Sequence, residues 1–165
     1  DKDAAVSELK EKVSKALRGF ENKGLTVEER NGKVYVSLEA KLLFASGSIA
    51  VDPKGKAALV QLAKVLEQNA DVNVVVEGHT DIDKYLGSVG GIKDNWDLSV
   101  LRATSVVRIL QENKAIDPTR ISASGKSEYL PVEAGTSESA KAKNRRIEVI
   151  LTPKLDELFK ILENN

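Results

Sequence analysis

The amino-acid sequence predicts an α/β (α+β) fold, a two-layer sandwich in which helices pack against a mixed β-sheet. Segments with strand-like patterning alternate with segments of helical periodicity through the middle of the chain. Hairpin-like sequence precedes that stretch, and strand-like sequence follows it. With 165 residues, 41% of them hydrophobic, the chain is long enough to bury one core.

The N-terminal segment is predicted to be an amphipathic helix. Its apolar residues recur at alternating steps of three and four positions: Val6, Leu9, Val13, Ala16 and Phe20. In one interpretation this helix docks on its own domain. In the other it is the end of a longer rod that leads to an anchor upstream.

A β-hairpin is predicted next. Strand-like residues 25–27 and 34–36 flank Asn31-Gly32, a pair suited to a type I′ turn because both central residues need a positive φ. After the apolar residues 42–44, Ser46-Gly47-Ser48 indicates a loop.

A helix should begin at Asp52 and Pro53, since aspartate favours the N-cap and proline the first helical position. It is expected to end near Asn69. The apolar residues of its buried face are Leu59, Leu62, Ala63 and Leu66.

The centre of the chain predicts a strand, a loop and a helix. Residues 72–76 are apolar with little alternation, as in an internal strand. Residues 82–94 contain three glycines and form a loop, and a helix runs from near Asp97 to about Asn113.

Two more strands and a last helix are predicted after that helix. Residues 120–124 and 146–151 are the strands, and the polar residues 126–143 between them are expected to be irregular. Pro153 should open a final amphipathic helix with an apolar face of Leu155, Leu158, Phe159 and Leu162. We therefore expect a helical segment and possible linker over residues 1–24, the main domain over 25–152, and the C-terminal helix over 153–165.

One charged residue is out of place on the helix that begins near Asp97. Arg102 falls within the apolar sector formed by Leu98, Leu101, Ser105 and Ile109. A guanidinium stays charged, so it must reach solvent, pair with a carboxylate or meet a ligand. Asp81 follows the preceding strand and should lie nearby, in a small polar pocket at the end of the sheet. An internal salt bridge and a ligand site are both possible, and an aspartate after a strand also commonly caps a turn.

The composition excludes several classes of function. Basic and acidic residues both number 25, so the sequence shows no basic stripe of the kind that binds nucleic acid. The chain has no cysteine and one histidine, too few ligands for a hydrolytic zinc site, and we expect neither a metal nor a cofactor. No apolar run is as long as a transmembrane helix, so we expect no membrane insertion by this chain.

The single histidine, His79, is interpreted as a residue whose ring bonds to backbone and shapes a turn. A catalytic role would need a nucleophile and an orienting acid. Ser99 and Asp81 are the candidates, but no nucleophile elbow surrounds the serine.

Five ordered motifs between about Val34 and Leu151 resemble the OmpA-like domain, the C-terminal peptidoglycan-binding domain shared by OmpA, MotB-type flagellar stators and peptidoglycan-associated lipoproteins. They are Leu42-Leu43-Phe44-Ala45-Ser46-Gly47-Ser48, Gly78-His79-Thr80-Asp81, Asn95-Trp96-Asp97-Leu98-Ser99-Val100-Leu101-Arg102-Ala103, Gly125 and Asn144-Arg145-Arg146. The resemblance implies a non-catalytic domain that binds the diaminopimelate of a peptidoglycan stem peptide.

The resemblance also assigns roles within the site. It implies that Asp81 takes the ligand ammonium and that Arg102 takes its carboxylate. Asn95 would contact the peptide backbone, or simply cap its helix. The other implied ligand-side residues are Thr80, Leu98, Arg145, Phe44 and Ser46, whereas Arg146 should face solvent or a structural partner. Ala45 stands where the family commonly has an acidic residue, so one ligand contact is missing.

The sequence thus predicts that the protein tethers an envelope component to the cell wall, in the periplasm and attached to the outer membrane. Its expected partner is diaminopimelate-type peptidoglycan. Two alternatives come from other classes of function. One is a structural module that binds another envelope protein, and the other is a periplasmic hydrolase that uses His79 and Asp81.

Overall fold

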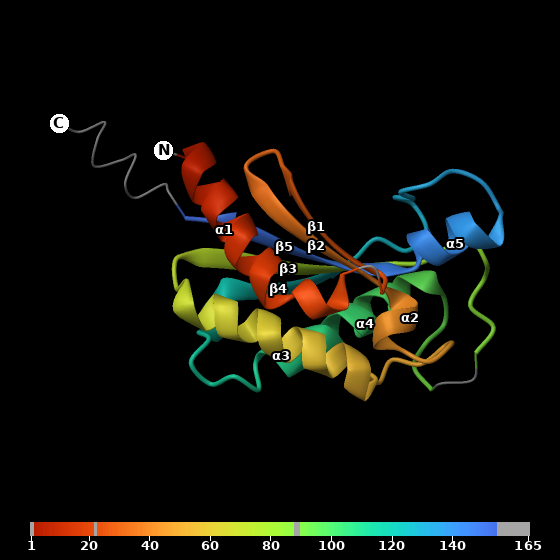
Figure 1. The fold of residues 1–165 in the computed structure, drawn as a ribbon. Helices are drawn as coiled ribbons and strands as arrows, with labels where there is room; N and C mark the ends of the chain where they lie inside the picture. The colour runs from red at the N-terminus through yellow and green to blue at the C-terminus, as the bar shows by residue number, and fades with distance from the viewer. Residues whose placement is uncertain (1, 22, 88–89, 155–165) are drawn as a thin grey trace, which may run out of the picture.

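The sheet is the frame of the molecule. In the computed structural model, which describes residues 2–21, 23–87 and 90–154, five strands form one mixed sheet with helices against it (Figure 1). In spatial order the strands are β1 (Leu25–Arg30), β2 (Lys33–Glu39), β5 (Arg146–Pro153), β3 (Val72–His79) and β4 (Ile121–Gly125). Neighbouring strands are antiparallel except β3 and β4, which are parallel. The predicted fold class is confirmed.

The three long helices lie on one face of the sheet (Figure 1). The helices are α1 (Lys2–Ala16), α2 (Ala40–Leu43), α3 (Pro53–Gln68), α4 (Asn95–Leu110) and α5 (Glu138–Asn144), with short 3₁₀ turns at η1 (Arg18–Phe20) and η2 (Pro118–Arg120). Helix α4 connects the parallel strands β3 and β4, and α5 lies at the end of the sheet where β5 begins (Figure 1). Among the described helices, none is both long and apolar enough to span a membrane.

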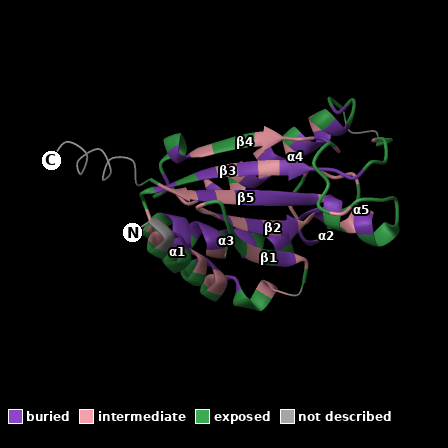
Figure 2. Ribbon diagram, turned by 90° about the horizontal axis from the view of Figure 1, so that it is seen from above, coloured by how far each residue is buried: buried purple, intermediate pink, exposed green. Residues whose placement is uncertain are grey.

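The N-terminal helix belongs to the core of the domain. The side of α1 that faces the sheet is buried at Val6, Leu9 and Val13, and Leu17 continues that face. These side chains join one apolar cluster with residues of α3, α4 and the sheet. Figure 2, coloured by burial, shows most of β5, in the middle of the sheet, as buried. The structure agrees with the first interpretation of this segment, in which the helix docks on its own domain.

Two local predictions are confirmed in detail. Asn31 and Gly32 have φ values of 51° and 75°, as a two-residue type I′ turn requires. Helix α3 begins at Pro53, and the side chain of Asp52 accepts a hydrogen bond from the Lys54 amide. The turn and the cap follow from local residue chemistry, which explains why the sequence predicts them well.

Helix α4 packs closely on β3 and β4 because glycines face it. A Cβ atom on Gly78 would lie 2.1 Å from the backbone oxygen of Ser99, and one on Gly125 would lie 2.5 Å from the Ser99 hydroxyl. The predicted buried face of this helix is wrong in part, because three of its residues are only half-buried: Leu101, Ser105 and Ile109. The residues that α4 buries are Asn95, Leu98, Ser99, Arg102, Ala103, Val106 and Leu110. Because several of these residues are small or polar, the periodicity of apolar residues does not identify the buried face of α4.

Two predictions near the C-terminus need correction. Residues 126–143 are not wholly irregular, because α5 begins at Glu138 and the side chain of Ser137 caps it. This helix buries only Ala140 and Asn144, so it has no apolar stripe that a sequence pattern could detect. Pro153 does not open a helix but is the last residue of β5. Residues 155–165 of the predicted C-terminal helix lie outside the described residues.

Candidate ligand-binding site

A cavity of about 610 Å³ lies where β3 ends and α4 begins. Its wall comes from α2 and the loop after it, the loop after β3, the first turns of α4 and the junction of α5 with β5. All eight residues that sequence analysis selected for ligand contact line this cavity: Phe44, Ser46, Thr80, Asp81, Asn95, Leu98, Arg102 and Arg145. The structure therefore brings together residues that are far apart in the sequence, from Phe44 to Arg145.

Arg102 is a buried charge in the cavity wall. It is 6% exposed, its Nε atom donates to the backbone oxygen of Ser48 at 2.9 Å, and its guanidinium carbon lies 4.7 Å from the centre of the Phe44 ring. Within the part of the chain that the structure describes, no carboxylate lies within ion-pair distance of it. The nearby ring and carbonyl stabilise the cation, but neither neutralises it.

The surroundings of Arg102 make its charge costly. Burial lowers the pKa of its guanidinium to about 10, and the positive charge of Arg145 acts in the same direction. The Tyr85 phenol and Asp81 partly oppose this decrease. Because that pKa lies well above neutral pH, Arg102 remains a buried cation, and an anionic ligand in the cavity would stabilise it.

Asp81 is paired with another residue of the cavity wall, Arg145. Its Oδ2 atom accepts a hydrogen bond from Nη1 of Arg145, and its Oδ1 atom accepts one from the amide of Asp83 at 2.9 Å. Of the alternatives that the sequence left open, the internal Asp81–Arg102 salt bridge does not form, whereas the turn-capping role of Asp81 is present. Arg145 lies far along the chain, so only the tertiary fold reveals this partner.

The loop after β3 is fastened at Asp83. The Asn95 amide donates to the backbone oxygen of Asp83 at 2.9 Å, and the ammonium of Lys141 lies 3.1 Å from its carboxylate. Asn95 does not cap α4, as one interpretation expected, because Asp94 does so by accepting from the Asp97 amide at 3.0 Å. The cavity wall is thus held between α4 and α5.

Sequence analysis missed part of the wall. The additional charged and bulky residues that line the cavity are Lys41, Asp83, Lys84, Tyr85 and Leu86. Most of them belong to the loop after β3, where no helical or strand periodicity marks which side chains face inward. Sequence analysis identified residues 82–94 only as a loop that contains three glycines.

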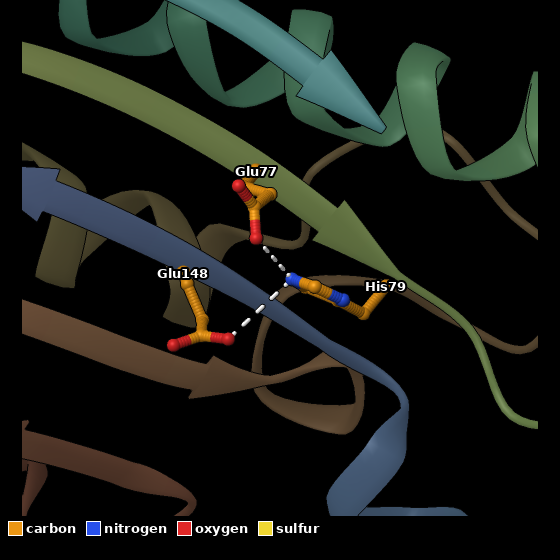
Figure 3. Close-up of side chains that lie close together, drawn as sticks. All are labelled: Glu77, His79 and Glu148. Atoms are coloured by element: carbon orange, nitrogen blue, oxygen red, sulfur yellow. Dashed lines mark hydrogen bonds and ion pairs between the residues drawn. The ribbon is translucent and has the colours of Figure 1, made fainter. Parts of the chain in front are cut away.

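His79 lies on the other face of the sheet, away from α4. Its Nε2 atom is 2.8 Å from a carboxylate oxygen of Glu77 and 3.4 Å from one of Glu148 (Figure 3). The expectation that its ring bonds to backbone is wrong, because carboxylates are its partners. Arg146 completes the group by donating to Glu148 from Nε and Nη2, at 3.0 and 2.8 Å. The prediction that Arg146 faces a structural partner agrees with this arrangement.

This cluster is an ion-pair network. The ligand atoms of Glu77, His79 and Glu148 lie within 4.8 Å of one another, close enough for a metal ion. The Arg146 guanidinium already occupies the Glu148 carboxylate, however, and a metal cation would have to displace it or sit beside it.

The residues named for a hydrolase do not assemble. Asp81 lines the cavity, whereas His79 contacts the two glutamates on the opposite face. The Ser99 hydroxyl donates to the backbone oxygen of Trp96 at 3.0 Å and accepts from the Ser127 amide at 3.1 Å. The serine therefore has no contact with the histidine that would activate it.

Together, the sheet order, the helices on one face and the charged cavity at the end of β3 define a class of α/β sandwich domain with a polar pocket at the sheet's end. Within that class the chain belongs to the OmpA family, whose model matches residues 43–145. This confirms the family resemblance that the sequence motifs indicated, and the match lies inside the stretch that they cover.

Known relatives agree with this assignment. Motility protein B of Bacillus subtilis is 30% identical over 119 residues, which are 72% of this chain and 45% of that protein. A MotB-like protein from Desulfovibrio vulgaris has a similar structure, with a TM-score of 0.77, 25% identity and coverage of 92% of this chain and 98% of that chain. The cell wall anchor of the T6SS from Pseudomonas aeruginosa has a TM-score of 0.76, 27% identity and coverage of 86% and 96%. The chain spans about half the length of the curated relatives that it matches.

Proposed function

We propose that this chain is a non-catalytic module that binds peptidoglycan through the diaminopimelate of its stem peptide and tethers an envelope component to the cell wall. The observation that carries the proposal is the buried Arg102 guanidinium, which faces the cavity with no carboxylate partner among the described residues. A ligand carboxylate would supply the missing charge. The likeness to a solved cell wall anchor supports the same function.

The free end of diaminopimelate suits this cavity because it carries an ammonium and a carboxylate on one carbon. The planar guanidinium of Arg102 matches a carboxylate, with its Nη groups available while Nε holds Ser48. Asp81 offers a carboxylate for the ammonium. The apolar side chains of Leu98 and Phe44 would cover the methylene groups of the ligand.

Binding at Asp81 would require an exchange of ion pairs. Arg145 occupies the Asp81 carboxylate in the free protein. When the ligand ammonium takes its place, Arg145 becomes free to hold a second carboxylate of the stem peptide. The side chain of Arg145 is 38% exposed, so it can move without losing core packing.

The location of the protein follows from the proposed ligand. A module that binds the stem peptide works in the periplasm, and we propose that the full protein is attached to the outer membrane. No catalytic step is part of this function, since the serine, histidine and aspartate considered for hydrolysis are apart.

Binding to intact peptidoglycan sacculi tests the proposal. Wild type should sediment with sacculi, and Arg102→Ala should not, because removing one partner of a hydrogen-bonded charge pair typically costs about 2–5 kcal/mol. Arg102→Lys should also bind poorly, since an ammonium cannot reproduce the planar fork. Arg108→Ala, which removes an exposed arginine from the same helix, is the matched control and should bind like wild type.

Other outcomes of that experiment would indicate other functions. Unchanged sedimentation of correctly folded Arg102→Ala would remove the cavity from the function. Release of soluble fragments from the sacculi would indicate a hydrolase. If neither binding nor release occurs, the chain is better explained as a module that binds another envelope protein.

A further inference from the structure

The hydroxyl of Tyr85 is an anomaly in the structure. It is buried and has no hydrogen-bond partner, and in the described part of the chain only one other side-chain atom, Nδ1 of His79, shares that condition. Buried hydroxyls almost always have partners, because leaving one unbonded forfeits its hydration without compensation. The position of Tyr85 therefore calls for an explanation beyond packing.

Tyr85 lies in the wall of the Arg102 cavity. It belongs to the loop after β3, between the paired Asp81 and the helix start at Asn95. Its phenol is near enough to Arg102 to affect the pKa of that guanidinium. Tyr85 is therefore close to the place where Arg102 would hold an anion.

Glycine makes room for the phenol. A Cβ atom on Gly87 would lie 2.3 Å from the Tyr85 hydroxyl oxygen, so the hydroxyl occupies space that any larger residue at position 87 would fill. Only the far end of the tyrosine side chain is held there, and it makes no hydrogen bond that would resist its rotation. A hydrogen bond to a ligand therefore requires the side chain to rotate, so that the hydroxyl leaves Gly87 and faces the cavity that Tyr85 lines.

We propose that Tyr85 is a specificity-determining residue whose hydroxyl donates a hydrogen bond to the ligand carboxylate held by Arg102. This inference rests on the proposed function, and it names a third group at the same anion. A carboxylate has lone pairs left after it engages the two Nη groups of Arg102, and a phenol O–H is a suitable donor to one of them. A carboxamide has an NH₂ group in place of one carboxylate oxygen. Because this group cannot accept a hydrogen bond from Arg102 or Tyr85, the site should discriminate against the carboxamide.

Calorimetry with defined peptides tests this assignment. The probes are the tripeptide L-alanyl-γ-D-glutamyl-meso-diaminopimelate and the same tripeptide amidated on one diaminopimelate carboxylate. The amidated carboxylate is the one on the carbon that carries the free ammonium. Tyr85→Phe, which removes one oxygen atom, should bind the free acid about 10-fold to 100-fold more weakly than wild type, as for loss of a hydrogen bond to a charged group. It should bind the amidated peptide with nearly the wild-type affinity.

Stability of the ligand-free protein supplies an independent readout. Because the hydroxyl has no partner before binding, Tyr85→Phe should leave the urea midpoint unchanged or raise it. Tyr35→Phe is the matched control, since Tyr35 lies on β2 beneath Arg30 and far from the cavity lining. That variant should bind both peptides like wild type.

The outcomes separate this inference from the proposed function. Wild-type binding of the free acid with equal affinity for Tyr85→Phe would overturn the role of Tyr85 alone. A lowered urea midpoint together with unchanged affinity would show that the hydroxyl serves the fold. Failure of wild type to bind the tripeptide would overturn the proposed function, and the role of Tyr85 with it.

Discussion

Arg102 and Asp81 line the same cavity, yet their charges are compensated in different ways. The aspartate has Arg145 and the turn amide of Asp83, whereas the arginine has a carbonyl oxygen and an aromatic ring. At the scale of single residues, the free protein is therefore ready for an anion at Arg102, while a cation must compete for Asp81. This difference leads to a prediction for Asp81.

Substitution of Asp81 by asparagine should separate binding from stability. Asparagine keeps an oxygen for the Asp83 amide and loses only the ion pair with Arg145, which is partly solvent-exposed. The free energy of unfolding should fall by about 1 kcal/mol or less, as for exposed pairs. Affinity for the stem tripeptide should fall far more, as urea melts and calorimetry would show.

Glu112→Gln is the control for that variant, because it breaks an exposed ion pair with Lys56 away from the cavity lining. A loss of several kcal/mol of stability in Asp81→Asn, with normal ligand affinity, would show that Asp81 serves the structure.

The buried glutamate network predicts a sensitivity to acid. The hydrogen bond from His79 holds the pKa of Glu77 below its ordinary value, despite the opposing effect of burial. A carboxyl group whose pKa is lower in the folded state stabilises the fold above its unfolded pKa of about 4.3. That contribution is lost as the pH falls through the lower folded pKa.

Glu77→Gln should therefore reduce the loss of stability on acidification. Compared with wild type, its urea midpoint should be lower at pH 7 and should change less between pH 6 and pH 3. Glu11→Gln, at an exposed position of α1, should follow the wild-type curve. A Glu77→Gln curve parallel to wild type throughout would contradict the assignment.

At the scale of elements, the approach of α4 to β3 places the site. The Gly78–Ser99 contact sets how close the helix lies, and the first turns of that helix carry Asn95 and Arg102 into the cavity wall. The loop after β3 is tied to this helix and to α5 through Asp83. A displacement of α4 should therefore change both stability and binding.

Gly78→Ala tests this coupling. Its new methyl group would lie 2.1 Å from the Ser99 backbone oxygen, so the helix must shift. Overpacking of this kind typically costs about 1–3 kcal/mol, and stem-peptide affinity should fall as Arg102 moves.

Thermal melts and calorimetry would measure both effects. Gly19→Ala, at a glycine with open space around it, should change the free energy of unfolding by no more than about 0.5 kcal/mol. Normal affinity in Gly78→Ala would mean that the site tolerates displacement of the helix.

At the scale of the whole molecule, α1 and the sheet share one apolar core. The helix face that ends at Leu17 contributes to the same apolar cluster as α3 and the central strands. The N-terminal segment is therefore a part of the folded domain, whatever else it connects.

Leu17→Ala should destabilise the entire domain. Replacement of a buried leucine by alanine costs about 2–5 kcal/mol, so one unfolding transition should shift to lower urea concentration with its slope unchanged. Lys15→Ala, at an exposed position nearby, should leave the midpoint in place. An early, separate loss of helical signal in Leu17→Ala would instead show that α1 unfolds independently of the sheet.

The sequence by itself determined the fold class, the turn at Asn31-Gly32 and the start of α3. These depend on local rules: backbone preferences at turns and caps, and the different periods of strands and helices. The family motifs then linked segments that local rules treat separately. For that reason all eight selected residues line one cavity.

Only the tertiary structure decided which charges meet. Asp81 could have paired with Arg102 or with Arg145, and the sequence offers no measure of the distances that choose between them. The sequence did not predict α5, because this helix buries too few apolar residues to produce a helical pattern. It did not identify Tyr85 as a cavity residue, because a loop has no periodicity that shows which side chains face inward. Interactions between distant segments depend on relative positions that arise when the core packs, and a linear pattern records those positions only indirectly.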